Sequence, residues 1–181
     1  MLSSAVVRGR PNPRFKGFPT RLRRARRAAK LSYASLSREA GLGTSATAYA
    51  LERGENIPRL DTVEKLARAL NISPCFLAFG VEPSCEPAHG MLCAGLPQRL
   101  RSAREALSLS MREIGRRSDT SATLVSSAES GATLPNLAKL EALAKALGVS
   151  PCWLAYGVGA QAMALRRRAR TPSQRSMADA R

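Results

Sequence analysis

The chain contains one nonapeptide twice, with only two aromatic residues changed: SPCFLAFGV at residues 73–81 and SPCWLAYGV at residues 150–158. The match continues towards the N-terminus at a spacing of 77 residues, and further back at 78 residues. Self-similarity over this length predicts two copies of one folded unit. We therefore expect residues 19–81 and 97–158 to be tandem domains, with one extra residue in the first copy ahead of Glu52.

Both copies have the hydrophobic periodicity of helices. Apolar residues fall on one helical face in the segments 60–70 and 137–147. The Ser-Pro pairs at 73–74 and 150–151 are typical of helix starts, with serine as the cap and proline in the first turn. No stretch alternates between apolar and polar residues as a strand does. The sequence thus predicts an all-α fold with five short helices in each copy.

Three segments lie outside the copies. Residues 82–96 contain prolines and glycines with little periodicity, and they predict a linker that extends to roughly 50 Å. Residues 1–18 predict a basic arm, and residues 159–181 predict a short helix with a basic tail. We expect the arm and the tail to be disordered because they are polar and charged.

The net charge of +16, from 29 Lys and Arg against 13 Asp and Glu, favours a polyanionic partner such as DNA, RNA or an anionic membrane. No apolar run approaches the roughly 20 residues of a membrane span. The apolar part of the N-terminus is too short for a signal peptide. We therefore expect a soluble, cytoplasmic protein with its four cysteines reduced.

Catalytic and metal-binding patterns are weak in this sequence. The single histidine, His89, lies between Cys85 and Cys93, and Cys75 would complete a Cys₃His set for zinc. The spacing is not that of a common zinc motif, and Cys152 occupies the position equivalent to Cys75 without such neighbours. A redox pair of Cys85 and Cys93 is the alternative. We predict no metal, no cofactor and no enzymatic activity, with Cys75 and Cys152 in the core.

An ordered set of residues occurs in both copies. The second copy reads LSMREIGRRSDTSATLVSSAESGATLP over residues 109–135, and the first has its leucine-serine, Glu-x-Gly and proline at matching positions. This set resembles the helix-turn-helix of the phage-repressor family (Cro/cI-like, XRE). The resemblance covers about two thirds of the chain. It implies two tandem five-helix, lambda-repressor-like DNA-binding domains.

The resemblance also implies structural roles and caps. In the family, an arginine of the first helix pairs with the glutamate that ends the third, and the matching residues are Arg26 with Glu52 and Arg104 with Glu129. Charges in a small core need such partners. Thr44 and Ser121 are the expected caps of the third helices.

The third helix of this architecture enters the major groove of DNA. We expect Ala48, Leu51, Val125 and Ala128 to face inward. The outward residues, which we predict to read bases, are Ser45, Ala46, Thr47, Tyr49, Ala50, Ala122, Thr123, Leu124, Ser126 and Ser127. None of these is the arginine, glutamine or asparagine that direct readout usually employs. Specificity would then come from close fit, DNA shape and the arms.

Ten residues are predicted to contact phosphate: Arg21, Arg23, Arg24, Tyr33, Arg38, Thr44, Arg53, Arg59, Arg116 and Ser121. The second copy has Ser130 and Asn136 in place of Arg53 and Arg59, which predicts stronger backbone binding by the first copy. The basic residues of the arm, including Arg8, Arg10 and Arg14, are candidates for the minor groove.

These patterns indicate a sequence-specific transcriptional regulator, in particular a repressor that binds double-stranded operator DNA. Three alternatives stay open: one copy serves dimerisation instead of reading bases, the chain is a protein-interaction module of an antitoxin-like or anti-activator kind, or it binds RNA as an autoregulator. A homodimer also stays open. Two copies in one chain suggest a covalent pseudo-dimer with a high effective concentration of the second module.

Overall fold

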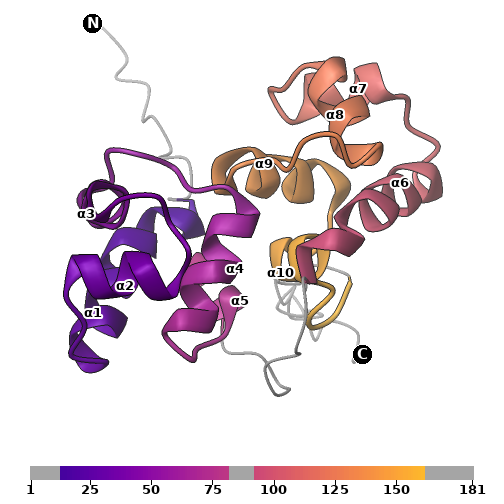
Figure 1. The fold of residues 1–181 in the computed structure, drawn as a ribbon. Coiled ribbons are helices and arrows are strands. Elements are labelled where there is room, and N and C mark those ends of the chain that lie inside the picture. Colours follow the sequence, from indigo (N-terminus) through magenta and orange to yellow (C-terminus); the bar gives the residue numbers. More distant parts are fainter. Residues whose placement is uncertain (1–12, 82–91, 162–181) are drawn as a thin grey trace, which may run out of the picture.

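The computed structural model describes residues 13–81 and 92–161, which form two five-helix units, each preceded by a turn of 3₁₀-helix (Figure 1). Unit 1 contains η1 (Arg14–Gly17), α1 (Phe18–Ala28), α2 (Tyr33–Glu39), α3 (Ser45–Arg53), α4 (Leu60–Ala69) and α5 (Pro74–Phe79). Unit 2 contains η2 (Leu92–Gly95), α6 (Leu96–Ala106), α7 (Met111–Arg117), α8 (Ala122–Glu129), α9 (Leu137–Leu147) and α10 (Pro151–Tyr156). Extended pairing in the described residues is confined to an isolated bridge between Arg59 and Asn136. The predicted all-α fold with two repeated units is confirmed.

The last helix of each unit begins and ends where the sequence provides caps. The Ser73 hydroxyl accepts a hydrogen bond from the Cys75 N–H, and Pro74 occupies the first helical position of α5. Its equivalent Ser150 accepts from the Trp153 N–H at the start of α10. Both helices end at a glycine in the left-handed conformation, which glycine adopts without steric cost. The predicted Ser-Pro helix starts are confirmed.

Each unit begins earlier than the sequence repeat indicates. The arm expected over 1–18 ends sooner, because η1 is helical and Phe18 is buried. The linker expected over 82–96 likewise ends sooner, because η2 is helical and Leu96 is buried. At the other end, residues 159–161 are not helical, so the short helix expected there is absent from the described part. The rest of the arm, linker and tail lies outside the described residues.

Two equivalent arginines hold these initial turns in place. The Arg21 guanidinium donates hydrogen bonds to three backbone carbonyls that join η1 to the end of α5, those of Arg14, Leu77 and Ala78. Arg99 does the same in unit 2 with the carbonyls of Leu92, Leu154 and Ala155. Burial lowers the pKa of both guanidinium groups. Because the acceptors are backbone carbonyls, the side chains of η1 and η2 need not match, and the sequence comparison therefore missed these turns.

The one-residue difference between the copies lies in the turn after the second helix. In unit 2 this turn packs on Gly115, where an added Cβ would lie 2.9 Å from the Thr120 carbonyl oxygen and 3.1 Å from the Ala122 nitrogen. Unit 1 has the buried Ser37 at the equivalent position, and its turn contains the additional residue Gly43. We infer that the longer turn makes room for a side chain there.

Gly115→Ala should therefore destabilise the protein by about 1–3 kcal/mol, because the new methyl group overpacks the turn backbone. Urea unfolding followed by circular dichroism measures the change. The matched control is Ser37→Ala, which keeps a Cβ in unit 1 and removes a buried hydroxyl without a hydrogen-bond partner in the described structure. The control should be neutral or slightly stabilising. Equal destabilisation by both variants would contradict the role assigned to the longer turn.

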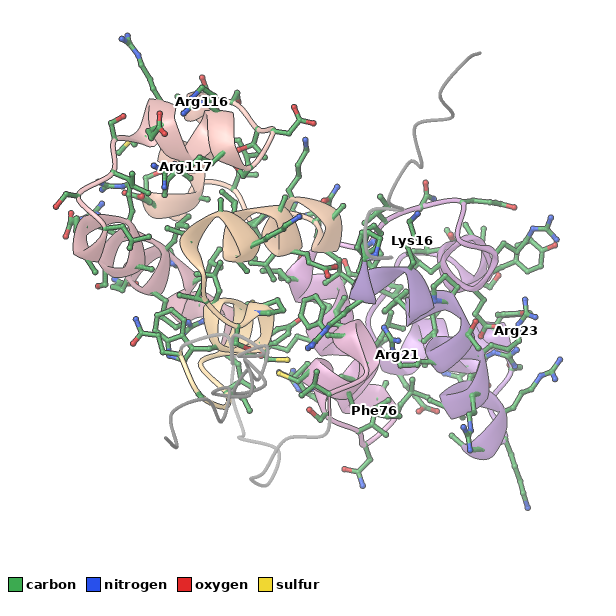
Figure 2. The ribbon with its side chains drawn as sticks, turned by 180° about the vertical axis from the view of Figure 1, so that it is seen from behind. Lys16, Arg21, Arg23, Phe76, Arg116 and Arg117 are labelled. Atoms are coloured by element: carbon green, nitrogen blue, oxygen red, sulfur yellow. The ribbon has the colours of Figure 1, made fainter. Side chains whose placement is uncertain are left out.

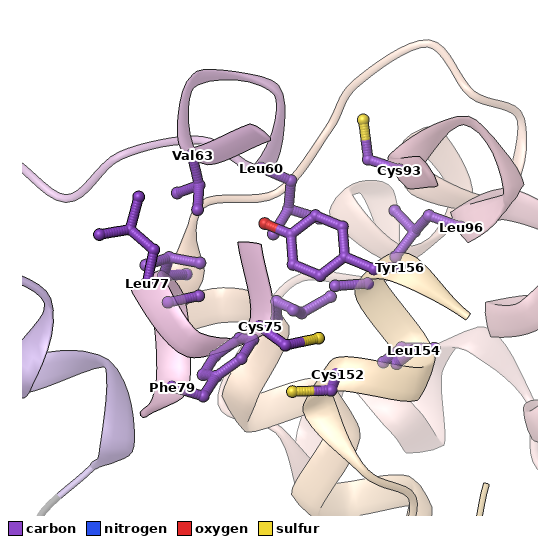
Figure 3. Packing of buried hydrophobic residues seen from close by; sticks show 14 of the residues in the cluster. Leu60, Val63, Cys75, Leu77, Phe79, Cys93, Leu96, Cys152, Leu154 and Tyr156 are labelled. Atoms are coloured by element: carbon purple, nitrogen blue, oxygen red, sulfur yellow. The ribbon is translucent and has the colours of Figure 1, made fainter. Parts of the chain in front are cut away.

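The two units pack against each other through buried residues. The buried apolar side chains of both units form one continuous cluster. Between α5 and α10, the sulfur atoms of Cys75 and Cys152 face one another (Figure 3). A hydrogen bond to the Cys152 thiol and burial raise the pKa of Cys75. The units are thus joined by a packed interface in addition to the chain between them.

The same interface contains matched polar contacts. Glu64 of α4 accepts hydrogen bonds from two backbone N–H groups of η2. Its equivalent, Glu141 of α9, accepts from two backbone N–H groups of η1. Arg59 and Asn136, which are also equivalent, form the isolated bridge. Each unit therefore supplies an acid that caps the first turn of the other.

Candidate nucleic-acid interface

A buried ion pair fixes α3 of unit 1 against α1. Arg26 Nε lies 2.5 Å from Glu52 Oε1, and the Glu52 side chain is fully buried. The Tyr33 hydroxyl donates to the second Glu52 oxygen at 3.1 Å, and the Arg26 guanidinium stacks on the Tyr33 ring. The hydrogen bond to Glu52 raises the pKa of Arg26. These contacts orient the last turn of α3, and with it the outer face of this helix.

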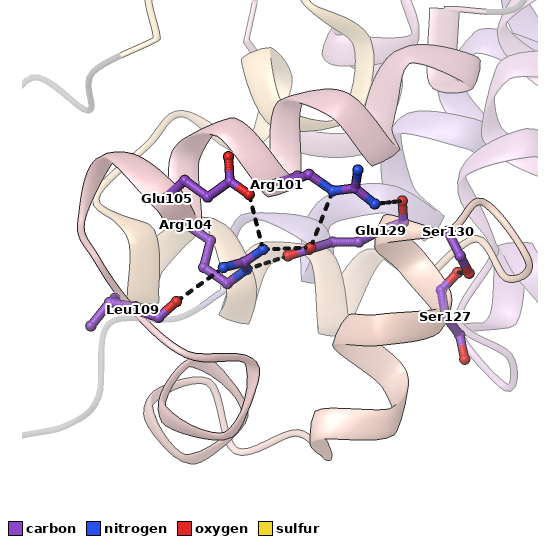
Figure 4. A network of polar contacts seen from close by, with 7 residues as sticks. All are labelled: Arg101, Arg104, Glu105, Leu109, Ser127, Glu129 and Ser130. Atoms are coloured by element: carbon purple, nitrogen blue, oxygen red, sulfur yellow. Dashed lines mark hydrogen bonds and ion pairs between the residues drawn. The ribbon is translucent and has the colours of Figure 1, made fainter.

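Unit 2 repeats this arrangement with α6 and α8 (Figure 4). Arg104 makes two hydrogen bonds to the Glu129 carboxylate, at 2.7 and 2.9 Å. Arg104 also donates to the Leu109 carbonyl, and Arg101 lies 3.7 Å from the same carboxylate. The structure thus contains both expected ion pairs, Arg26 with Glu52 in unit 1 and Arg104 with Glu129 in unit 2.

The outer face of α3 has small side chains apart from one tyrosine. Thr44 occupies the cap position, but its hydroxyl caps no backbone N–H and lies 3.4 Å from the Thr47 hydroxyl. Ser45, Ala46 and Tyr49 are exposed, and Tyr49 is 45% exposed. Among the other expected residues, Thr47 and Ala50 are half-buried, whereas Ala48 and Leu51 are buried.

The outer face of α8 has still smaller side chains. The Ser121 hydroxyl caps this helix by accepting from the Leu124 N–H at 3.1 Å. Thr123 and Ser126 are exposed. The remaining predicted base-reading residues are half-buried, namely Ala122, Leu124 and Ser127, and the inward residues Val125 and Ala128 are buried. Leu124 packs partly against the core, so it is less outward than expected because its apolar side chain gains from burial.

Two of the residues predicted to contact phosphate have partners within unit 1. The Tyr33 hydroxyl donates to Glu52, and its ring lies between Arg26 and Tyr49. The Arg21 guanidinium is bound to carbonyls of its own unit. Contacts within unit 1 thus already use the Tyr33 hydroxyl and the Nε and Nη2 groups of Arg21.

The other predicted phosphate contacts are exposed. Arg24, Arg38, Thr44 and Ser121 lie on the surface, and Arg23 is 49% exposed although it lies 3.6 Å from Glu52. The remaining three arginines pair with nearby acids, namely Arg53 with Glu55, Arg59 with Asp61 and Arg116 with Glu113. Exposed pairs of this kind contribute little to stability, so a phosphate can replace the acid.

Three basic residues of unit 2 were not singled out from the sequence. Arg112 and Arg117 are exposed on α7, and Lys139 donates to the Asp119 carbonyl. Figure 2 shows Arg116 and Arg117 on unit 2 and Lys16 and Arg23 on unit 1. Hydrogen bonds from Arg116 and Arg117 lower the pKa of Glu113 to about 2. Comparison of the two copies does not point to Arg112 and Arg117, because the equivalent residues of unit 1 are an alanine and a glutamate and not basic residues.

The positive charge is unevenly distributed between the units. Residues 13–81 contain thirteen Lys and Arg against five Asp and Glu. Residues 92–161 contain eight against five. Unit 1 thus has the stronger attraction for a polyanion.

The cysteines offer no assembled metal site in the described part of the chain. Cys85 and His89 lie outside the described residues. Cys93 is buried, and burial and the neighbouring Glu64 raise its pKa to about 12. Over residues 13–81 and 92–161, no three His, Cys, Asp or Glu side chains are grouped to hold a metal ion. None of the helices there has the length and apolar character needed to cross a bilayer.

Comparison with known proteins matches the two units to one family. The helix-turn-helix family model matches residues 22–77 and again residues 100–154. The two matched segments together cover more than half of the chain and contain α3 and α8. No curated protein and no solved structure matches the chain.

Proposed function

The chain belongs to the helix-turn-helix family of the Cro/cI-like (XRE) type, whose domains are of the DNA-binding, transcription-regulating kind, and from this premise we propose that it binds specific DNA sequences and represses transcription by occupying promoter DNA. The observation that carries the proposal is the pair of exposed outer faces on α3 and α8. Each face is held in place by a buried ion pair at the end of its helix. A rigid, solvent-facing third helix is what major-groove reading requires.

The charge of the molecule supports the same proposal. The arginines around α3 are exposed or paired only at the surface, so they are available to phosphate oxygens. Arginine binds phosphate in a forked geometry, and phosphate contacts position a protein on DNA while base contacts give specificity. Unit 1 is therefore the main anchor in the proposed complex.

A protein-interaction module is the second candidate. The observation in its favour is the outer face of α8, whose exposed side chains are Thr123 and Ser126. Small side chains make few bidentate base contacts. The net charge of +16 favours the nucleic acid over a protein partner. An RNA target is less favoured, since aromatic residues that stack on bases make up only 4% of the chain.

Selection of binding sites from fragmented genomic DNA, with the full chain at near-physiological salt, tests the proposed function. Enrichment of one short motif in promoter regions is the expected result. Weak binding of all fragments with no enriched motif would contradict sequence-specific regulation. Transcription from an enriched promoter in the presence of the protein then tests repression directly.

Substitutions at Ser45 and Tyr49 should change the base preference of unit 1 without abolishing binding. Tyr49→Ala should alter discrimination at one or two base pairs by about 1–3 kcal/mol, a typical value for a single base-pair contact. Competition binding against single-base variants of the selected site measures this. The matched control is Gln98→Ala, at an exposed residue outside both recognition helices, and it should leave the preference unchanged. If Tyr49→Ala lowers the affinity for all single-base variants of the site equally, Tyr49 does not read bases.

A further inference from the structure

The contacts between the two units are reciprocal in detail. Glu141 accepts from the Arg14 and Phe15 N–H groups at 2.9 and 3.2 Å. Glu64, which lies 77 positions earlier, accepts from the two N–H groups that lie 78 positions later, those of Leu92 and Cys93. When patch A of one unit contacts patch B of the other and B also contacts A, the units are related by a two-fold rotation.

Two further contacts join a residue to its own equivalent. Arg59 pairs with Asn136 in the isolated bridge, and Cys75 lies against Cys152 (Figure 3). A position can touch its own equivalent only close to a two-fold axis. The axis therefore passes between the loops that precede α4 and α9 and between α5 and α10. A head-to-tail arrangement, which a tandem repeat also permits, would bring unlike surfaces together instead.

Buried contacts fix this relation. Glu64 is 6% exposed, Cys75 is 1% exposed and Cys152 is 3% exposed, and the apolar cluster continues across the interface. Closely packed interiors have discrete arrangements and do not slide freely. The relative orientation of α3 and α8 is therefore set by packing and not by the length of the connecting chain.

The two recognition helices lie on opposite sides of the interface. In Figure 1, α3 lies at the outer left of unit 1 and α8 at the upper right of unit 2, whereas α5 and α10 lie between them near the boundary between the units. The two-fold rotation that relates the units also relates the outer faces of α3 and α8. Because operator symmetry mirrors protein symmetry, such a pair reads half-sites that are inverted relative to each other.

We propose that a single chain binds DNA as a complete pseudo-dimer, on a site with two inverted and unlike half-sites at one fixed spacing. The inference rests on the proposed DNA-binding function and specifies its DNA target. The half-sites are unlike because Ser45, Ala46 and Tyr49 face outward from α3, whereas Ala122, Thr123 and Ser126 occupy the equivalent positions of α8. The tandem order of the copies alone would suggest a direct repeat, so the structure and the sequence order predict different sites.

Selection from a random-sequence duplex library with the full chain, followed by mass measurement of the complex, tests the proposal. The expected result is two different motifs in inverted orientation at one spacing, with one chain on each DNA. Two motifs in direct orientation, or at variable spacing, would overturn the proposed geometry while leaving DNA reading intact. Two identical motifs bound by two chains would overturn the single-chain pseudo-dimer. Absence of any enriched motif would overturn the proposed function itself.

A duplex series with the wild-type protein sharpens the test without depending on any variant. It contains the selected site, the same site with one half-site reversed, and the same site with about five base pairs inserted, half of the roughly 10-base-pair turn. Reversal and insertion should each weaken binding by about 10²-fold or more, since the second unit loses its high effective concentration. Equal binding to all three duplexes would overturn the proposal.

Removal of Glu64 and Glu141, the acids through which each unit contacts the other, should relax the required spacing between the two half-sites. Glu64→Ala with Glu141→Ala deletes the contacts between each unit and the first turn of the other. The expected result is a smaller difference in binding affinity between the selected site and the duplex with inserted base pairs. The matched control, Glu39→Ala with Glu105→Ala, makes the same charge change at exposed positions and should keep the wild-type difference. An unchanged difference in the first variant, shown to be folded by circular dichroism, would overturn the role assigned to Glu64 and Glu141.

Discussion

Raising the salt concentration from about 50 to about 200 mM should weaken DNA binding by this chain by roughly 10³-fold or more, as expected for a protein that neutralises six or more phosphates. The physical reason is the release of condensed cations from DNA when arginine and lysine replace them. Unit 1 alone has thirteen basic residues against five acidic residues over 13–81. Titration of labelled duplex with protein at four or more salt concentrations gives the slope of log K against log salt.

Variants separate phosphate contacts from bulk charge in that experiment. Arg38→Gln with Arg53→Gln, at exposed positions of α2 and α3, should weaken binding to every sequence alike and reduce the slope by about 0.9 for each lost phosphate contact. The matched control is Lys65→Gln with Lys145→Gln, which removes the same charge from exposed positions of α4 and α9. The control should leave the slope close to that of the wild type. If the two double variants have the same affinity and salt slope, net charge governs binding, and the surface of α2 and α3 is not the proposed contact with DNA.

Glu52→Ala should destabilise the protein by about 3–5 kcal/mol, the usual effect of removing one partner of a buried pair. The Glu52 side chain is fully buried and accepts hydrogen bonds from Arg26 and Tyr33. Its removal leaves Arg26, whose side chain is only 11% exposed, without its main counter-charge. Urea unfolding measured by circular dichroism reports the loss. Because Glu52 holds the end of α3, DNA affinity should fall in the same variant.

Two comparisons show whether burial is the cause. Glu55→Ala removes an acid three residues away whose pair with Arg53 is more than half exposed, and it should cost less than about 1 kcal/mol. The double variant Arg26→Met with Glu52→Leu replaces the pair by apolar groups and should be more stable than Glu52→Ala. Similar values for Glu52→Ala and Glu55→Ala would show that the pair does not stabilise unit 1.

The helices could be predicted because their signals are local. Short segments contain the apolar faces of α4 and α9 and the Ser-Pro starts of α5 and α10. They also contain the leucine-serine, Glu-x-Gly and proline positions around α3 and α8. The four charged residues that pair in the two cores were identified from the family resemblance, and the structure brings them together. Among the residues predicted to contact phosphate, Arg21 and Tyr33 have partners within unit 1 that the sequence did not reveal, because these partners come from distant segments.

The sequence by itself determined that this protein has two copies of one helical unit with a basic surface, because periodicity, caps and charge are properties of neighbouring residues. Only the tertiary structure decided where each unit begins and how the units are related. The turns η1 and η2 are held by Arg21, Arg99 and acids of the opposite unit, through backbone groups that any residue supplies. The two-fold relation depends on reciprocal contacts between Glu64, Glu141 and residues about 30 to 130 positions away, and a tandem sequence is compatible with either orientation of its copies.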